Sequence, residues 1–307
     1  MRRSAAWAGL AGSVLAAAAC GGSARQAAPA PAPFAYDQTQ PLHLEDRGRV
    51  NDAAHPLAVR DVSFRSGGDL VRGYLVVPPG RRRLPAAVYL HGSGGDRAQL
   101  LAHASWLAAR GALTLALTAP SRSASFPAGL TGPEALRHQR AIATRDVIAV
   151  RRAFDVLESL PRVDRSRLGF LGWSAGARTG AILAGVERRP RAFVLMSGGA
   201  TPVSAYAAQA PPDLRPQVVR VLRGVDPLRF IRRARPATLL LQNGRRDEVV
   251  PQAALAALAG AAPRGAEVRW YSAGHDLDVG ARREQLAWLS RKLAISGPPV
   301  RGARTGP

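Results

Sequence analysis

Cysteine is almost absent from this chain, which has one such residue, Cys20, among 307. A single thiol excludes a disulfide framework and any zinc site built from several cysteines. Aromatic residues are also scarce, at 6%, but hydrophobic residues together reach 47%. Alanine, leucine and valine are therefore numerous enough to build a large core, and wholesale disorder is excluded. The length fits one large α/β domain or two smaller domains.

Lysine is also scarce in this chain. The chain has 43 basic and 21 acidic residues, a net charge of +22, and Lys292 is the only lysine. Such an excess of base suggests nucleic acid or an anionic membrane as a partner. The arginines are scattered from Arg2 to Arg304 among abundant alanine, glycine and proline, which indicates a genome-wide compositional bias. Because no nucleic-acid-binding motif accompanies the charge, we expect no nucleic-acid partner.

The amino terminus has the pattern of a secretory signal peptide. Two arginines follow Met1, and the apolar stretch Ala5 to Ala19 ends at Cys20. Fifteen residues are too few to span a bilayer as a helix, so we interpret residues 1–19 as a signal peptide. The sequence A-A-A-C at residues 17–20 resembles a bacterial lipoprotein cleavage site, although alanine stands at position 17, where leucine is usual. We expect an exported protein, anchored to a cell-envelope membrane through lipidated Cys20.

The alternative is an ordinary signal peptide with an incidental Cys20, which would leave the protein periplasmic or extracellular. Proline recurs through residues 23–33, where it fixes φ and removes backbone donors, as in an extended tether. We expect residues 20–57 to contain the lipid-anchor site and this tether. Residues 58–295 are predicted to form the folded domain, and residues 296–307 a disordered tail.

Alternating strand and helix patterns fill the folded part. Residues 59–65 and 70–77 predict a hairpin, and the later apolar runs lack the alternation of half-exposed strands, which is typical of strands buried in a parallel sheet. These patterns predict an α/β fold, a mostly parallel doubly wound sheet with an antiparallel start. The later strands are expected at residues 86–90, 112–118, 168–172, 192–196, 238–242 and 267–271, and the helices at 147–157, 177–186 and 286–293.

Residues 197–236 are too long for an ordinary connection. They contain six prolines and no strand signal, which predicts a lid-like insertion or binding element. Its arginines either face solvent, the favoured interpretation, or meet a substrate carboxylate. Its apolar residues either line an acyl site or pack on the domain. The apolar residues are Tyr206, Leu214, Val218, Val219, Leu222 and Phe230, and the arginines are Arg229, Arg232, Arg233 and Arg235.

The pentapeptide at residues 172–176 reads G-W-S-A-G, the G-x-S-x-G pattern of a nucleophile elbow. It stands between a predicted strand and a predicted helix, so the turn would expose the Ser174 hydroxyl above the sheet. Gly172 and Gly176 are required because a Cβ at either position would collide across the turn. Trp173, beside the nucleophile, is a candidate substrate-binding residue.

A glycine-rich loop, H-G-S-G-G at residues 91–95, follows the predicted strand at 86–90. In folds with a nucleophile elbow, this loop and the residue after the nucleophile each supply a backbone N–H to an oxyanion hole. Those donors would be Ser93 and Ala175. The alternative is a phosphate-cradling loop, but the lysine of a P-loop is missing.

The base follows from the chain order of serine, acid and histidine in such folds, because His275 is the only histidine after Ser174. The acid that orients it must come from a loop after a strand. Asp247 fits best, and Glu248 is the neighbouring alternative. Two further acids follow the histidine, Asp276 and Asp278, which we interpret as surface or capping residues.

Together these motifs resemble the α/β-hydrolase superfamily, in particular its dienelactone-hydrolase and prolyl-oligopeptidase-like branch, over roughly residues 59–293. Ser174 replaces the cysteine of true dienelactone hydrolases, so their lactone substrate is not carried over, and no propeller domain precedes the fold. The resemblance implies a serine hydrolase that cleaves a small carboxylic ester through an acyl-enzyme, without metal or cofactor. The alternatives are a peptidase or amidase, an acyltransferase, or an inactive binding module.

The lipoprotein interpretation can be tested by Cys20→Ala. We expect the variant to lose labelling by a radioactive fatty acid and to move from the membrane fraction to the soluble fraction, because it lacks the thiol that carries the lipid. Unchanged membrane fractionation of the variant would contradict the anchor.

Overall fold

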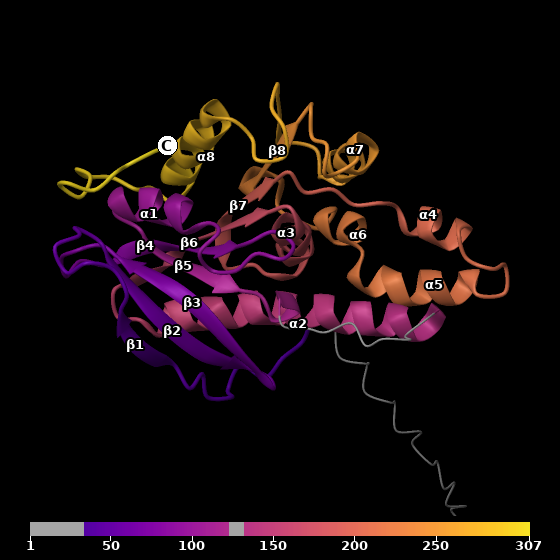
Figure 1. The fold of residues 1–307 in the computed structure, drawn as a ribbon, viewed down its shortest axis with the longest axis horizontal. Helices are drawn as coiled ribbons and strands as arrows, with labels where there is room; N and C mark the ends of the chain where they lie inside the picture. The colour runs from indigo at the N-terminus through magenta and orange to yellow at the C-terminus, as the bar shows by residue number, and fades with distance from the viewer. Residues whose placement is uncertain (1–33, 123–131) are drawn as a thin grey trace, which may run out of the picture. The chain divides into compact units, whose positions relative to one another are not determined.

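A mixed β-sheet forms the centre of the protein (Figure 1). The computed structural model describes residues 34–122 and 132–307. Within these residues the strands are β1 (Glu45–Arg49), β2 (Ala58–Ser66), β3 (Asp69–Val77), β4 (Leu84–Leu90), β5 (Leu113–Thr118), β6 (Val163–Trp173), β7 (Pro190–Met196), β8 (Leu239–Gly244) and β9 (Glu267–Tyr271).

The strand order in space is β1-β2-β3-β5-β4-β6-β7-β8-β9. Strands β1 to β3 pair antiparallel, β3 pairs antiparallel with β5, and every pair from β5 to β9 is parallel. The predicted fold class, a mostly parallel α/β sheet with an antiparallel start, is confirmed. Strand β4 shows why the apolar runs do not alternate, since all seven of its residues are buried.

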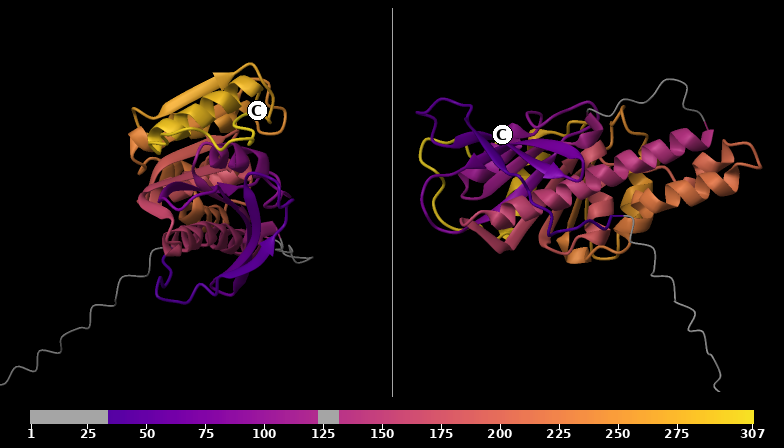
Figure 2. Two further views of the ribbon diagram at one scale, coloured as in Figure 1. Left: turned by 90° about the vertical axis from the view of Figure 1, so that its left-hand side faces the viewer. Right: turned by 90° about the horizontal axis from the view of Figure 1, so that it is seen from below.

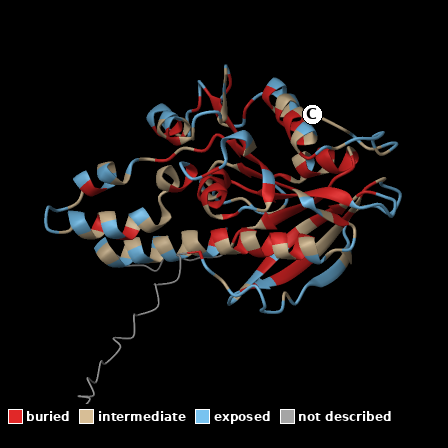
Figure 3. Ribbon diagram, turned by 180° about the vertical axis from the view of Figure 1, so that it is seen from behind, coloured by how far each residue is buried: buried red, intermediate tan, exposed pale blue. Residues whose placement is uncertain are grey.

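Helices cover both faces of the sheet, as Figure 2 shows from two further directions. Helices α1 (Leu101–Ala109) and α8 (Val279–Lys292) pack on one face. Helices α2 (Gly132–Ser159) and α3 (Ala175–Val186), together with part of α7 (Gln252–Ala261), pack on the other. Buried residues accordingly gather along the strands and on the helix faces turned toward them (Figure 3).

Helix α2 buries the apolar positions that the helical period predicts, including Val150 and Phe154. The opposite face of α2 is also partly buried by other residues, because Arg152 on that face is only 3% exposed. The Arg152 guanidinium donates to the carbonyl oxygens of Gln40 and Pro41. The segment before β1 is therefore fixed to the outer side of α2 by an arginine that satisfies main-chain acceptors.

The insertion at residues 197–236 is helical and contains no strand, as its sequence predicts. Helix α6 starts where Asp226 accepts a hydrogen bond from the Leu228 N–H and Pro227 occupies the first turn. Phe230 of α6 is buried and packs edge-on against Phe34. The helical elements of the insertion are α4 (Val203–Ala208), α5 (Arg215–Leu222), the 3₁₀ turn η2 (Arg223–Val225) and α6 (Pro227–Ile231).

Two regions differ from expectation. Strand β1 was not predicted because its sequence is polar, which suits an edge strand that pairs on one side only. Residues 296–307, expected to be disordered, lie against α1: the Val300 N–H donates to the Ala109 carbonyl oxygen, and the Arg110 guanidinium donates to that of Thr305. Val300 and Ala303 supply the apolar contacts that make this position favourable.

The signal peptide, Cys20 and residues 23–33 of the tether lie outside the described residues. Among the helices that the structure describes, none combines the length and the apolar character needed to cross a bilayer.

The contact between α3 and α6 depends on a glycine. A Cβ on Gly185 would lie 2.2 Å from the Phe230 carbonyl oxygen, so Gly185→Ala must displace the α6 backbone. We expect it to lower the free energy of unfolding by about 1–3 kcal/mol, measured by urea denaturation. Gly260→Ala in α7 is the matched control, because open space surrounds that position. The control should leave stability unchanged or raise it by up to about 1 kcal/mol. Equal effects of the two substitutions would contradict the predicted clash.

Candidate active site

Ser174 stands at a strained turn between β6 and α3. Its φ of 55° and ψ of −114° are a conformation that L-residues rarely adopt. A Cβ on Gly172 would lie 2.3 Å from the Gly176 carbonyl oxygen, and one on Gly176 would lie 2.3 Å from that of Leu90. The Ser174 N–H donates to the Met196 carbonyl oxygen of β7 at 2.8 Å. The turn therefore has the geometry of a nucleophile elbow, and both glycines are required for it.

His275 and Asp247 form a hydrogen-bonded pair. His275 Nδ1 lies 2.8 Å from Asp247 Oδ2. The other carboxylate oxygen of Asp247 accepts the N–H groups of Val249 and Val250, each at 2.9 Å. The Asp247 side chain is fully buried, whereas the His275 side chain is 12% exposed. The carboxylate is thus held from one side by backbone donors and presents its free edge to the imidazole.

The other acids near His275 have different positions. Glu248 is exposed, and Asp247, not Glu248, contacts the imidazole. Asp278 caps α8 by accepting the Ala281 N–H at 2.7 Å, as its position after the histidine suggested.

The loops that hold this pair are bonded to each other through their backbones. The N–H groups of Arg245 and Arg246 donate to the carbonyl oxygens of Tyr271 and Ala273. Gly244, at the end of β8, permits the approach, since a Cβ there would lie 2.4 Å from the Gly274 carbonyl oxygen. The distance between Asp247 and His275 is therefore fixed by main-chain contacts as well as by their own hydrogen bond.

Two side chains position the His275 backbone. Trp173 Nε1 donates to the His275 carbonyl oxygen at 3.2 Å, and the two rings lie 5.1 Å apart between centroids. Ser197 Oγ donates to the same carbonyl oxygen at 2.7 Å. The sequence interpretation gave Trp173 to the substrate and overlooked Ser197. Ser197 adopts a positive φ of 49°, for which the sequence carries no signal.

The loop after β4 is held by a buried histidine. The Ala119 N–H donates to His91 Nε2 at 2.9 Å, so that nitrogen carries no proton and the Nδ1–H donates to the Gly92 carbonyl oxygen at 2.6 Å. Gln99 Oε1 accepts the Gly92 N–H. Because the Gly92–Ser93 peptide is trans, fixing its carbonyl turns the Ser93 N–H to the opposite side. Burial lowers the pKa of His91, which favours this neutral tautomer.

The predicted catalytic, oxyanion-hole and substrate-binding residues lie where β4, β6, β8 and β9 end, at the carboxyl edge at which α/β sheets bind ligands. Among the hydrogen bonds within residues 34–122 and 132–307, none joins Ser174 Oγ to His275, a link that often forms only with substrate bound. None engages the N–H of Ser93 or Ala175 either. The described residues hold no cluster of acids, histidines or cysteines able to bind a metal ion.

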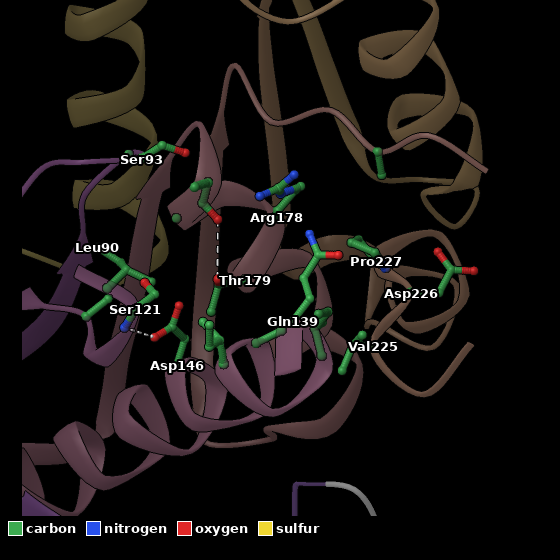
Figure 4. A pocket seen from close by; sticks show the side chains of 18 of the residues that line it. Leu90, Ser93, Ser121, Gln139, Asp146, Arg178, Thr179, Val225, Asp226 and Pro227 are labelled. Atoms are coloured by element: carbon green, nitrogen blue, oxygen red, sulfur yellow. Dashed lines mark hydrogen bonds between the residues drawn. The ribbon is translucent and has the colours of Figure 1, made fainter. Parts of the chain in front are cut away.

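A cavity of about 440 Å³ opens next to the candidate oxyanion donors (Figure 4). Ser93 and Ala175 line it, and so do Tyr206 and Leu222 of the insertion. Of the four insertion arginines considered as anion binders, none lines this cavity. Two of them donate to main-chain carbonyl oxygens instead, Arg229 to that of Arg223 and Arg235 to those of Arg188 and Pro190.

Asp146 of α2 is a cavity residue that the sequence interpretation missed. Its side chain is buried, and one carboxylate oxygen accepts the Ser121 N–H at 2.9 Å (Figure 4). Burial raises the pKa of Asp146 to about 6. The sequence did carry a signal for this residue. Asp146 stands four residues before Val150, a spacing that puts an acid on the apolar face of a helix.

Solved structures of other proteins resemble this chain over most of its length. An acetyl xylan esterase from a Paenibacillus species is 21% identical, with a TM-score of 0.68, over 82% of this chain and 89% of that one. Acetyl xylan esterase 1 from a Thermoanaerobacterium species is 16% identical, with a TM-score of 0.68, over 83% and 89%. An alpha/beta hydrolase from a Penicillium species is 16% identical, with a TM-score of 0.56, over 76% and 98%.

No family model and no curated protein matches the chain. The strand order, the elbow between β6 and α3 and these structural likenesses together show that the protein has the α/β-hydrolase fold. Its structural neighbours include esterases.

The buried carboxyl of Asp146 makes stability depend on pH. Because its pKa is raised from 3.8 to about 6, the folded protein binds more protons than the unfolded chain in that window, and stability falls as pH rises through it. Asp146→Asn removes this penalty and keeps an acceptor for Ser121. We expect the variant to be more stable than the parent at pH 8, by up to about 3 kcal/mol, and no more stable at pH 3.5. Thermal unfolding at both pH values measures the difference.

Asp164 supplies a control of opposite sign, because hydrogen bonds from Ser166 and Arg167 lower its pKa to about 2. Asp164→Asn should therefore lower the melting temperature at pH 8. A gain for Asp146→Asn that is the same at both pH values would contradict the assignment.

Proposed function

We propose that this protein is a serine hydrolase that cleaves a carboxylic ester through an acyl-enzyme. The observation that carries the proposal is the buried Asp247–His275 pair, at the same sheet edge as the strained turn bearing Ser174. A backbone-held carboxylate, an oriented imidazole and a hydroxyl raised above the sheet are the three parts of a serine, histidine and aspartate triad. The likeness to structures named as esterases supports an ester as substrate.

In this mechanism His275 Nε2 accepts the proton of Ser174 as Oγ attacks the carbonyl carbon of the ester. Asp247 holds the Nδ1–H, so Nε2 is the nitrogen left free to act as base. His275 then gives its proton to the leaving alcohol. It next activates a water molecule that hydrolyses the acyl-enzyme and regenerates Ser174.

The N–H groups of Ser93 and Ala175 act as donors to the negative charge that develops on the carbonyl oxygen. The Ser93 donor has a fixed direction because His91 and Gln99 bind the polar groups of Gly92. Removing one such donor typically costs about 3 to 4 kcal/mol of transition-state stabilisation. In this proposal Trp173, whose ring lies against that of His275, contacts the leaving alcohol as a substrate-binding residue.

The proposed cellular location of the protein rests on the sequence of its amino terminus and is independent of the fold. The proposal is that the protein is exported and is held at a cell-envelope membrane by a lipid on Cys20, with its site open to small ester substrates.

Ser174→Ala tests the reaction. We expect the variant to remain folded, by circular dichroism, and to lose turnover of p-nitrophenyl esters by at least about 10⁴-fold, since no other group supplies the nucleophile. Labelling by a fluorophosphonate should occur on Ser174 in the parent and disappear in the variant. A folded parent that neither turns over the esters nor accepts the label would be a binding module instead, and the proposed function would be wrong.

The two adjacent acids allow a matched comparison of roles. Asp247→Asn should lower kcat by about 10⁴-fold, because an amide at this position stabilises the wrong imidazole tautomer. Glu248→Gln changes the same chemical group one residue away, on an exposed side chain, and should leave kcat within about twofold. Equal losses in both variants would contradict the role of Asp247. Peptide and amide substrates, and an added alcohol as acceptor, in the same assay separate an esterase from an amidase and an acyltransferase.

A further inference from the structure

The cavity next to the candidate oxyanion donors lies between several parts of the chain, including the segment after β5 (Figure 4). The loop after β4, helix α2, the first turns of α3 and the insertion at residues 197–236 all contribute to its lining. Both candidate oxyanion donors, Ser93 and Ala175, stand on its wall, whereas Ser174, Trp173 and His275 are absent from it. The cavity therefore begins at the candidate oxyanion donors and does not reach the imidazole.

This position decides which half of an ester would enter the cavity. The leaving oxygen must come within hydrogen-bond distance of His275, which protonates it. The carbonyl oxygen must point at the N–H groups of Ser93 and Ala175. The leaving oxygen and the carbonyl oxygen occupy two of the three substituent positions on the carbonyl carbon. The third substituent, the acyl chain, then points away from His275 and into the cavity.

The size of the cavity is far above what an acetyl group fills. An apolar cavity of about 150 Å³ holds a benzene molecule, and this one measures about 440 Å³. Charged and polar side chains line part of it, among them Arg122, Gln139, Asp146, Arg178 and Asp226, and apolar groups line the larger part. The apolar side chains come from α2, α3 and the insertion and include Leu136, Ile142, Ile182, Val203, Leu222 and Val225.

We propose that this cavity is the acyl-binding site and that the protein hydrolyses esters of predominantly apolar acids much larger than acetate. The inference rests on the proposed function and adds the substrate class. It departs from the acetyl group in the names of two structural neighbours. The reason is physical, because an acetyl methyl would leave most of the cavity to water.

The insertion is the part of the chain that sets the size of this site. Val203 of α4 and Val225 of η2 both line the cavity and are half-buried. Val203 is not part of the hydrophobic core, and Val225 packs against the edge of the core as a half-buried residue. A larger side chain at either position therefore takes volume from the acyl site without a collision inside the sheet.

Chain length is the measurement that tests this site. We would compare kcat/KM for p-nitrophenyl acetate, butyrate, hexanoate and octanoate, in which the leaving group is constant. Each methylene that leaves water for an apolar site strengthens binding about fourfold. We expect the hexanoate to exceed the acetate by at least about tenfold. A preference for acetate that declines steadily with chain length would overturn the inference.

Substitutions in the insertion test whether this cavity causes the chain-length preference. Val203→Trp should reduce kcat/KM for the hexanoate at least about tenfold and leave the acetate within about threefold. Val225→Trp, on another wall of the cavity, should likewise reduce kcat/KM for the hexanoate and spare the acetate. This second variant keeps the test decisive if Val203→Trp fails to fold. Ser204→Trp is the matched control, because Ser204 is exposed on the same helix and does not line the cavity.

The outcomes separate this inference from the proposed function. If fluorophosphonate labels Ser174 and the esters turn over without a length preference, the inference fails and the serine hydrolase stands. Equal loss on the acetate and the hexanoate in both tryptophan variants at cavity positions also refutes the acyl site. Absence of both labelling and turnover overturns the function and the inference together.

Discussion

The hydrogen bond between His275 Nδ1 and Asp247 is the interaction on which the site depends. It joins two loops that follow neighbouring parallel strands, and it has the right length only if β8 and β9 keep their register. Gly244 permits the close approach of those loops, and backbone hydrogen bonds from Arg245 and Arg246 hold it. The sheet therefore sets the spacing between Asp247 and His275, and the elbow after β6 brings the Ser174 hydroxyl to the same edge.

The arginine excess has a structural use in the described residues. Arg189 binds three carboxylates at once, those of Asp155, Glu158 and Glu187, and Arg152 is buried against two main-chain carbonyl groups of the segment before β1. Guanidinium groups suit this role because five donors in one plane can satisfy several acceptors. These two arginines fasten the outer layer of α2 to its neighbours, and within the described residues no arginine forms an ion pair with Asp247.

Most of the fold could be predicted from the sequence, because parallel strands buried on both faces read as continuous apolar runs and the helices between them keep a clear period. The elbow and the histidine loop could be placed for the same reason. Strand β1 could not, since an edge strand needs no apolar residues, and neither could the packing of Val300 on the core. The cavity was also beyond the sequence: it exists only where α2, α3 and the insertion meet, so the importance of Asp146 and Val203 depends on distances between segments far apart in the chain.

The histidine after β4 has a consequence for how the protein responds to acid. Both ring nitrogens of His91 are occupied, one as acceptor and one as donor, and burial lowers its pKa. Protonation would break the bond to the Ala119 N–H, so the loop resists it. The shape of the loop after β4 is therefore insensitive to mild acid.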